Sequence, residues 1–251
     1  MEKPMSEQRT ALVTGALGGI GSVIAARLAA DGFRVAHADI LERPDAGDDY
    51  FRADLMQSGA GEQLVADVIA RFGRLDVVVN NAGAQKVSPI AEFNRADWDL
   101  VRTLSLDASF ETIKAAVPGM VARGWGRIIN IASAHGLIAS PFKAAYTAAK
   151  HGLVGLTKSV ALEVAEAGVT ANAICPGYVR TPLVERQIDD QMKVHGLSRE
   201  AVIRDIMLAS QPTRRFVEAE EIAGLASYLA TDAARSITGT AISIDGGWTA
   251  R

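Results

Sequence analysis

A short apolar run passes into a helical pattern through one glycine-rich stretch, Ala11-Leu12-Val13-Thr14-Gly15-Ala16-Leu17-Gly18-Gly19-Ile20-Gly21, and the helical pattern continues to Ala30. Glycines let the backbone turn tightly and approach a pyrophosphate, whose charge then meets the positive end of the helix. The spacing differs from the common G-x-G-x-x-G form, and a plain turn is the alternative. The place of the loop between a strand and a helix predicts dinucleotide binding, with contacts from Gly15, Leu17, Gly19, Ile20 and Gly21.

The same alternation of strand and helix continues along the chain. The expected strands are Ala11–Val13, Arg34–Ala38, Leu75–Val79, Ile128–Ile131, Val169–Ile174 and Ala241–Ile244, and the expected helices are Ile20–Ala30, Gln63–Phe72, Trp98–Ala122, Ala144–Ala165 and Glu220–Leu229. This order predicts an α/β fold of the Rossmann type, a doubly wound and mostly parallel sheet with helices on both faces. Four glycines are expected to end helices: Gly32, Gly73, Gly124 and Gly168.

The chain has 251 residues, of which 49% are hydrophobic, so it can bury one full core. We expect a single dinucleotide-binding catalytic domain over residues 1–251. Only residues 183–216 lack a clear strand and helix rhythm, and we expect a helical lid there beside the active site. The alternative is a surface excursion that only packs on the sheet.

Composition argues against several classes of partner. The net charge is −3, and no cluster of lysines and arginines offers the surface that a nucleic-acid binder needs. No uncharged run reaches the ~18 residues of a membrane span, and Met1 to Arg9 is polar. We therefore expect a cytoplasmic protein that binds neither nucleic acid nor membrane. Its single cysteine, Cys175, is expected to be buried and inert, and no metal site is predicted.

Acidic and amide residues at strand ends predict further cofactor contacts. Asp39 follows the second expected strand, eighteen residues after Gly21, close to the ~20 typical of the carboxylate that binds the adenosine ribose. That carboxylate repels a 2′-phosphate, so NAD is expected rather than NADP. A cap or turn is the alternative role for Asp39. Contacts are also expected from Asp54, Leu55, Asn81, Ala82 and Gly83, where a turn is again the alternative.

Three residues are spaced for proton transfer. Tyr146 and Lys150 stand four apart in an alanine-rich helical pattern and so share one helix face, and Ser133 follows the apolar run Ile128–Ala132. A free phenol titrates near ~10, and a fixed ammonium one turn away is expected to lower the pKa of Tyr146. Taken singly, each residue is more often structural, but together they predict a catalytic site.

With the glycine loop, Asn80-Asn81-Ala82-Gly83, the Ser/Tyr/Lys set and Pro176-Gly177 in this order, the chain resembles the short-chain dehydrogenase/reductase family over essentially its whole length. The resemblance implies that Tyr146 is the acid/base, that Ser133 holds the reacting oxygen, and that Lys150 holds the nicotinamide ribose. It also implies a homotetramer, built through the helices around 98–122 and 144–165 and the last strand. The cofactor positions that it adds are Tyr146, Lys150, Pro176, Gly177, Val179 and Thr181.

One catalytic position departs from the family pattern. The family usually has Asn where this chain has Ser105, and that residue fixes a water between the lysine and bulk solvent. Serine can hold a water but reaches less far. We expect Ser105 to support a functional but altered proton relay.

Within the family, several stretches are similar to those of bacterial enzymes that oxidise (R)-3-hydroxybutyrate to acetoacetate. By that resemblance, Lys143 brings charge to the substrate carboxylate, His135 can bring charge too, and two glutamines bring directed donors; the four residues are Gln85, His135, Lys143 and Gln187. Tyr178 and Trp248 are expected to form apolar walls, with core packing as the alternative. The competing hypotheses are a related enzyme for another small hydroxy acid or ketone, and a non-catalytic member of the fold.

Overall fold

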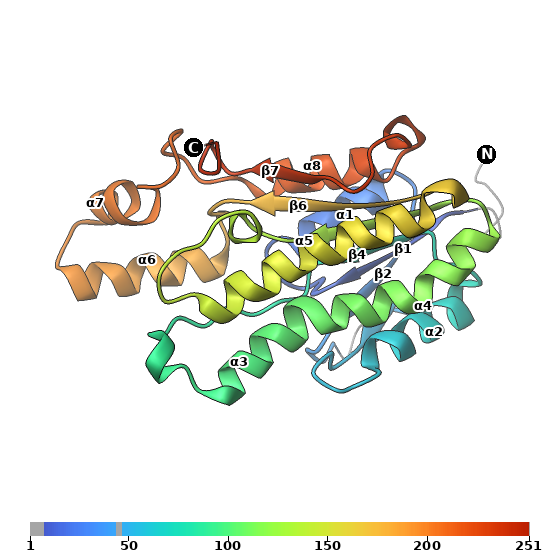
Figure 1. Cartoon of the computed structure of the whole chain (residues 1–251), viewed down its shortest axis with the longest axis horizontal. Coiled ribbons are helices and arrows are strands. Elements are labelled where there is room, and N and C mark those ends of the chain that lie inside the picture. Colours follow the sequence, from blue (N-terminus) through green and yellow to red (C-terminus); the bar gives the residue numbers. More distant parts are fainter. Residues whose placement is uncertain (1–7, 44–46, 251) are drawn as a thin grey trace.

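The computed structural model describes residues 8–43 and 47–250. Its described residues form one parallel sheet with the strand order β3-β2-β1-β4-β5-β6-β7 (Figure 1). The strands are β1 (Thr10–Thr14), β2 (Arg34–Asp39), β3 (Tyr50–Arg52), β4 (Val77–Asn80), β5 (Gly126–Ile131), β6 (Val169–Pro176) and β7 (Ala241–Ile244). The helices are α1 (Gly21–Ala30), α2 (Ala60–Phe72), α3 (Arg95–Arg102), α4 (Ala108–Ala122), α5 (Ala144–Val164), α6 (Pro182–His195), α7 (Arg199–Ala201) and α8 (Ala219–Leu229). The predicted Rossmann-type fold is confirmed.

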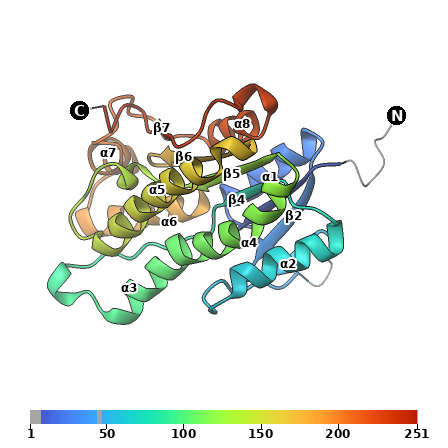
Figure 2. The ribbon, with the colours of Figure 1, turned by 45° about the vertical axis from the view of Figure 1, so that its right-hand side comes forward.

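Helices cover both faces of the sheet. Since successive side chains of a strand point to opposite faces, all of them are buried in the central strands. On one face Val13 and Ile129 pack with α1 and α8, and on the other Leu12 and Ile128 pack with α2, α4 and α5. Figures 1 and 2 both show α2, α4 and α5 lying across one side of the sheet and α1 beside α8 on the other. This burial explains why the central strands are near-continuous apolar runs rather than alternating ones.

The glycines that were predicted to end helices have the backbone conformation expected of them. The four glycines predicted to end helices, Gly32, Gly73, Gly124 and Gly168, all adopt positive φ, from +65° to +91°. This region of backbone space suits glycine because it has no Cβ.

The expected helix over Trp98–Ala122 is the clearest difference. It begins earlier, at Arg95, where the Asn94 side chain accepts a hydrogen bond from the amide of Asp97. A π-helical turn, Thr103–Asp107, then separates α3 from α4. Periodicity does not reveal such a turn, since one wider turn disturbs the apolar pattern very little.

Where a helical insertion is expected, over residues 183–216, the structure has α6, which begins at Pro182, then α7 and a second π-helical turn, Val202–Met207, and we call residues 182–207 the insertion. It has an apolar cluster of its own that includes Val184, Ile188 and Phe216. In Figure 1 the insertion lies beyond the carboxyl ends of the strands. Closure of this segment over a substrate stays a prediction.

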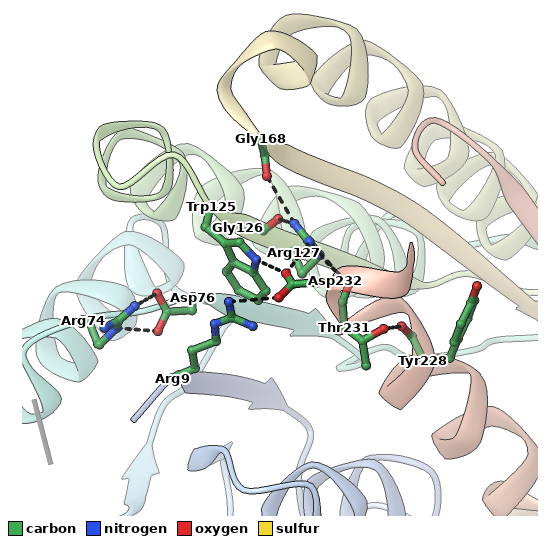
Figure 3. Close-up of polar contacts among 10 residues, drawn as sticks. All are labelled: Arg9, Arg74, Asp76, Trp125, Gly126, Arg127, Gly168, Tyr228, Thr231 and Asp232. Atoms are coloured by element: carbon green, nitrogen blue, oxygen red, sulfur yellow. Dashed lines mark hydrogen bonds and ion pairs between the residues drawn. The ribbon is translucent and has the colours of Figure 1, made fainter. Parts of the chain in front are cut away.

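A buried arginine lies at the amino end of a central strand (Figure 3). Arg127, at the start of β5, is 1% exposed and donates hydrogen bonds to the carbonyls of Gly126 and Gly168 at 2.8 and 3.2 Å. Its guanidinium also lies 3.4 Å from the Asp232 carboxylate, which accepts a hydrogen bond from the Trp125 indole. In open α/β sheets a ligand generally binds at the carboxyl ends of the strands, the end away from Arg127.

Candidate active site

Two neighbouring hollows open at the carboxyl ends of the central strands. The larger measures about 370 Å³ and lies between the glycine loop, the end of β2 and the end of β4. The smaller measures about 160 Å³ and lies among the end of β5, the start of α5, the start of α6 and the C-terminal loop. Most of the predicted site residues line one of these two hollows.

The glycine loop is packed too tightly for side chains at two of its positions. Gly15 has a φ of +63°, and a Cβ at Gly21 would lie only 2.2 Å from the Gly15 carbonyl oxygen. Gly15 and Gly18 line the larger hollow, Ile20 lines the smaller one, and Gly19 lies between them in the chain. Gly18 was not among the predicted contacts, although it belongs to the same loop.

Asn81 serves the loop as a support. Its side-chain amide donates to the carbonyls of Thr14 and Gly15 at 2.9 and 3.1 Å. Thr14, which was not predicted, accepts the amides of Asn81 and Ala82 on its hydroxyl, both at 3.0 Å. The hydroxyl of a threonine that ends a strand gives no local signal of this role, because its partners lie far along the chain.

Two carboxylates stand on the far side of the larger hollow. Asp39 accepts hydrogen bonds from the amides of Leu17 and Leu41 at 3.0 and 3.3 Å, so it also fixes the glycine loop. Asp54 accepts the amide of Met56 at 3.1 Å and thereby closes a turn. Both line the hollow together with Leu55, Ala82 and Gly83, which are also predicted cofactor contacts. Leu100 and Leu104 complete its wall and were not predicted.

Ser133, Tyr146 and Lys150 converge at the junction of the hollows. Ser133 and Tyr146 line the smaller hollow together. The Lys150 ammonium donates to the Ile131 carbonyl at 2.8 Å and lies 5.7 Å from the centre of the Tyr146 ring. The three side chains selected by their spacing therefore lie near one another, and their catalytic role stays a prediction.

The electrostatics of this cluster differ from the expectation. Burial raises the pKa of Tyr146, and the hydrogen bond with Ser133 opposes the rise. Burial lowers the pKa of Lys150 to about 8. The predicted lowering of the tyrosine pKa by Lys150 is not seen: burial has the largest effect on this pKa, and the Lys150 ammonium is directed at the Ile131 carbonyl.

Ser105, in the π-helical turn, lies near Lys150 of α5. It is fully buried, and its hydroxyl accepts the amide of Ala84 at 3.4 Å. A Cβ at Gly83 would lie 3.2 Å from the Ser105 hydroxyl and 3.7 Å from the Lys150 nitrogen. Both polar atoms therefore face the same small region behind Gly83.

Polar side chains from separate segments line the smaller hollow with Ser133 and Tyr146. They are Gln85, His135, Lys143 and Thr181, while the side chain of Gln187, on α6, lies outside the described residues. Within the part of the chain that the structure describes, the Lys143 ammonium has no hydrogen bond or ion pair, and burial lowers its pKa. No aspartate or glutamate is among the described residues that line the hollow.

His135 cannot supply charge at neutral pH, contrary to one expectation. It is 3% exposed, and burial together with the nearby charge of Lys143 lowers its pKa to about 4. Its Nε2 lies 2.9 Å from the hydroxyl of Ser140, so the ring is held in one orientation. The neutral imidazole still offers a directed hydrogen bond.

An aromatic wall closes one side of the smaller hollow. The rings of Tyr178 and Trp248 stack at 5.6 Å with an interplanar angle of 6°, and the edge of the stack meets His135, 5.2 Å from Trp248. The Lys143 ammonium lies 5.5 Å from the centre of the Tyr178 ring. The two rings line the hollow, which agrees with the predicted walls.

The remaining predicted positions follow β6. Gly177, Val179 and Thr181 line the smaller hollow, and Pro176 ends the strand. The hydroxyl of Thr181 also caps α6 by accepting the amide of Val184 at 3.3 Å. Cys175 is fully buried, and burial raises the pKa of its thiol to about 11, as expected for an inert cysteine.

Metal-binding clusters and membrane-spanning helices are both missing from the described residues. No group of histidine, cysteine, aspartate or glutamate side chains is arranged there to hold a metal ion. No described helix is both long enough and apolar enough to cross a membrane.

Known proteins are similar to this chain in sequence and in fold. Residues 15–249 match the protein family described as Enoyl-(Acyl carrier protein) reductase. The chain is 49% identical to D-beta-hydroxybutyrate dehydrogenase of Rhizobium meliloti (strain 1021), over 97% of this chain and 99% of the relative. It is 44% identical to D-beta-hydroxybutyrate dehydrogenase of Cupriavidus necator, over 98% of this chain and 100% of the relative. The crystal structure of a variant of actinorhodin polyketide ketoreductase with NADPH matches with a TM-score of 0.88 and 34% identity, and the match covers 100% of both chains. The chain therefore belongs to the short-chain dehydrogenase/reductase family.

Proposed function

We propose that this protein oxidises (R)-3-hydroxybutyrate to acetoacetate, reversibly, with NAD. Its family consists of oxidoreductases whose Rossmann fold binds a nicotinamide cofactor. Two relatives of nearly equal length carry the name D-beta-hydroxybutyrate dehydrogenase. These similarities support the reaction class. The charge of Lys143 in the smaller hollow supports a substrate with a carboxylate.

Lys143 is the observation that carries the proposal. Its ammonium is partly buried beside Ser133 and Tyr146, without an acidic partner among the described residues that line the hollow. A buried charge that lacks a partner costs free energy, which a substrate carboxylate would offset. The hollow, at about 160 Å³ and closed on one side by Tyr178 and Trp248, suits a small hydroxy acid.

The side chains can hold a hydroxyl group and remove its proton. Ser133 would donate a hydrogen bond to the substrate oxygen while the Tyr146 phenolate takes the hydroxyl proton, and the carbinol carbon becomes a ketone carbon. A bound nicotinamide supplies the acceptor for the hydride that leaves this carbon. Because burial raises the pKa of Tyr146, its phenolate needs a nearby positive charge, and the Lys150 ammonium, 5.7 Å from the centre of the ring, would supply it. In the reverse direction Tyr146 returns the proton.

The larger hollow fits the adenosine half of NAD. Its walls include Gly15 and Gly18 of the glycine loop and the carboxylate of Asp39. No lysine or arginine is among the described residues that line it, so a 2′-phosphate would meet a carboxylate without a compensating cation. The NADPH bound in the ketoreductase crystal structure is a property of that protein. We expect a higher kcat/KM with NAD than with NADP, and equal use of both would contradict this assignment.

An absorbance assay of NADH formation tests the substrate. We expect 3-hydroxybutyrate to be oxidised with a higher kcat/KM than its amide or methyl ester, because the neutral analogues lack the carboxylate. Equal rates for acid and ester would count against carboxylate recognition. Turnover of another hydroxy acid or a ketone instead would identify a related enzyme, and no turnover of any compound would support a non-catalytic protein.

A pair of lysine variants sharpens this test. Lys143→Met is expected to raise KM for the acid by about 10-fold or more, and to change KM for the ester much less, since it removes one charge-assisted contact. Lys86→Met serves as the matched control, because Lys86 is exposed and pairs with Asp97 at 3.2 Å. If both variants changed KM for the acid equally, Lys143 would have no specific role.

A further inference from the structure

Gln211 is a buried amide that joins segments far apart in the sequence. Its side chain is fully buried, its Oε1 accepts the backbone amide of Tyr178, and its Nε2 donates to the carbonyl of Arg215 at 2.8 Å. Its own backbone amide donates to the carbonyl of Leu208, which directly follows the 182–207 insertion and belongs to its apolar cluster. One residue therefore ties the end of the insertion to the loop that follows β6.

The same side chain lies against the C-terminal loop. A Cβ at Gly177 would come within 2.4 Å of the Gln211 Oε1 and 3.0 Å of the Asp245 Cα. A Cβ at Gly246 would come within 2.2 Å of the hydroxyl of Thr213 and 3.5 Å of the Gln211 Nε2. Only glycines at positions 177 and 246 let the loop after β6 and the C-terminal loop approach Gln211 so closely. A change at Gln211 is therefore transmitted to both loops.

Both neighbouring segments carry the aromatic wall. Tyr178 follows Gly177 directly, and Trp248 stands in the loop whose amides bind the Asp245 carboxylate, at 3.0 Å for Gly247. Tyr178 also packs on the apolar cluster of the insertion. The stack of Tyr178 on Trp248 thus depends on a backbone amide that Gln211 holds.

We propose that Gln211 is the positioning residue for the Tyr178–Trp248 wall, and that it sets the fit of the small hydroxy acid by coupling this wall to the 182–207 insertion. The inference rests on the proposed function, because the wall discriminates between substrates only if the substrate lies in the smaller hollow. Gln211 acts through Tyr178 and does not itself line that hollow. Its loss therefore affects substrate binding more than the proton transfer at Tyr146.

Replacement of Gln211 by Met tests this with a side chain of similar length that makes no hydrogen bonds. We expect KM for 3-hydroxybutyrate to rise about 10-fold, kcat to fall less than about 3-fold, and the Kd of NADH to stay within about 2-fold. With 5-fluorotryptophan in all three tryptophans, the fluorine NMR signal of Trp248, assigned from Trp248→Phe, should shift while those of Trp98 and Trp125 stay.

Asn172→Leu is the matched control. Asn172 is a buried amide in the middle of β6, where it donates to the Ile237 carbonyl at 2.7 Å and accepts the Thr240 amide at 3.3 Å. It should lower the melting temperature without moving KM or the Trp248 signal. The proposal is overturned if Gln211→Met leaves the Trp248 signal unmoved, or if Asn172→Leu raises KM as much.

Failure of the proposed function gives a different result. If the wild type does not oxidise 3-hydroxybutyrate, KM is measured for whichever hydroxy compound it does oxidise, and the Trp248 signal still decides the role of Gln211. A shifted signal then supports the positioning role, and an unmoved signal overturns it.

Discussion

Replacement of Tyr146 by Phe removes one hydroxyl and keeps a ring of the same shape against His135, whose centre lies 5.8 Å away. We expect turnover to fall by about 10²- to 10⁴-fold, because the proton acceptor is lost, while the Kd of NADH changes little. Steady-state kinetics and a fluorescence titration with NADH measure the two effects. Tyr228→Phe, on the exposed face of α8, is the control and should keep full activity. Substantial turnover by the Tyr146 variant would exclude the proposed mechanism.

His135 makes the stability of the fold depend on pH in a defined direction. Its pKa is about 4 in the folded chain and about 6.5 when unfolded, so between these values the unfolded chain binds the extra proton. The contribution is therefore fully present above pH 6.5 and lost as the pH falls to 4, by about 3 kcal/mol at most. His135→Gln should reduce this acid-dependent loss in urea unfolding measured at pH 7 and pH 4.5. An unchanged loss in that variant, relative to the exposed-site variant His151→Gln, would contradict the assignment.

At the scale of the element, the π-helical turn Thr103–Asp107 sets how Ser105 meets Lys150. The wider turn directs the Ser105 hydroxyl at the Ala84 amide and the region behind Gly83, where the Lys150 nitrogen also lies. A longer side chain from the same position reaches further into this region. The effect of a substitution at position 105 therefore depends on the direction that the π-helical turn gives its side chain, as well as on the residue type.

Ser105→Asn is expected to leave the Kd of NADH within about 2-fold of the wild type and to shift the pH dependence of kcat, because a polar group is moved nearer to Lys150. Burial already lowers the pKa of Lys150 to about 8, so a shift should show between pH 7 and 9. Ser105→Ala serves as the control that removes the hydroxyl without adding reach. An identical pH profile for all three proteins would mean that position 105 takes no part in proton transfer.

At the scale of the whole molecule, a feature can be predicted from the sequence when the residues that form it are close together along the chain. The six expected strands, the glycine helix ends and the Tyr146–Lys150 pair were predictable, because each depends on neighbours a few residues away. The support of the glycine loop by Thr14 and Asn81 was not, since the contact joins residues 66 to 68 apart. The neutral state of His135 and the raised pKa of Tyr146 were also missed, because burial is a property of the assembled fold.

Large apolar side chains remain exposed on the two helices that the resemblance assigns to a homotetramer. Leu162 on α5 is 82% exposed, and Phe110 on α4 is 50% exposed. Such side chains on adjacent helices support association between copies of the chain, since burial of each removes apolar surface from water. We propose a homotetramer that uses this face, and we expect sedimentation velocity at micromolar concentration to give four times the chain mass of 26.5 kDa.

Leu162→Glu and Phe110→Glu should each shift the protein to smaller species, because a charge buried at an interface is costly without a partner. Leu197→Glu is the matched control, as Leu197 is 42% exposed but lies on the 182–207 insertion, away from α4 and α5. It should sediment as the wild type does. A monomeric wild type would contradict the homotetramer, and tetramers in all three variants would place the interface on another face of the molecule.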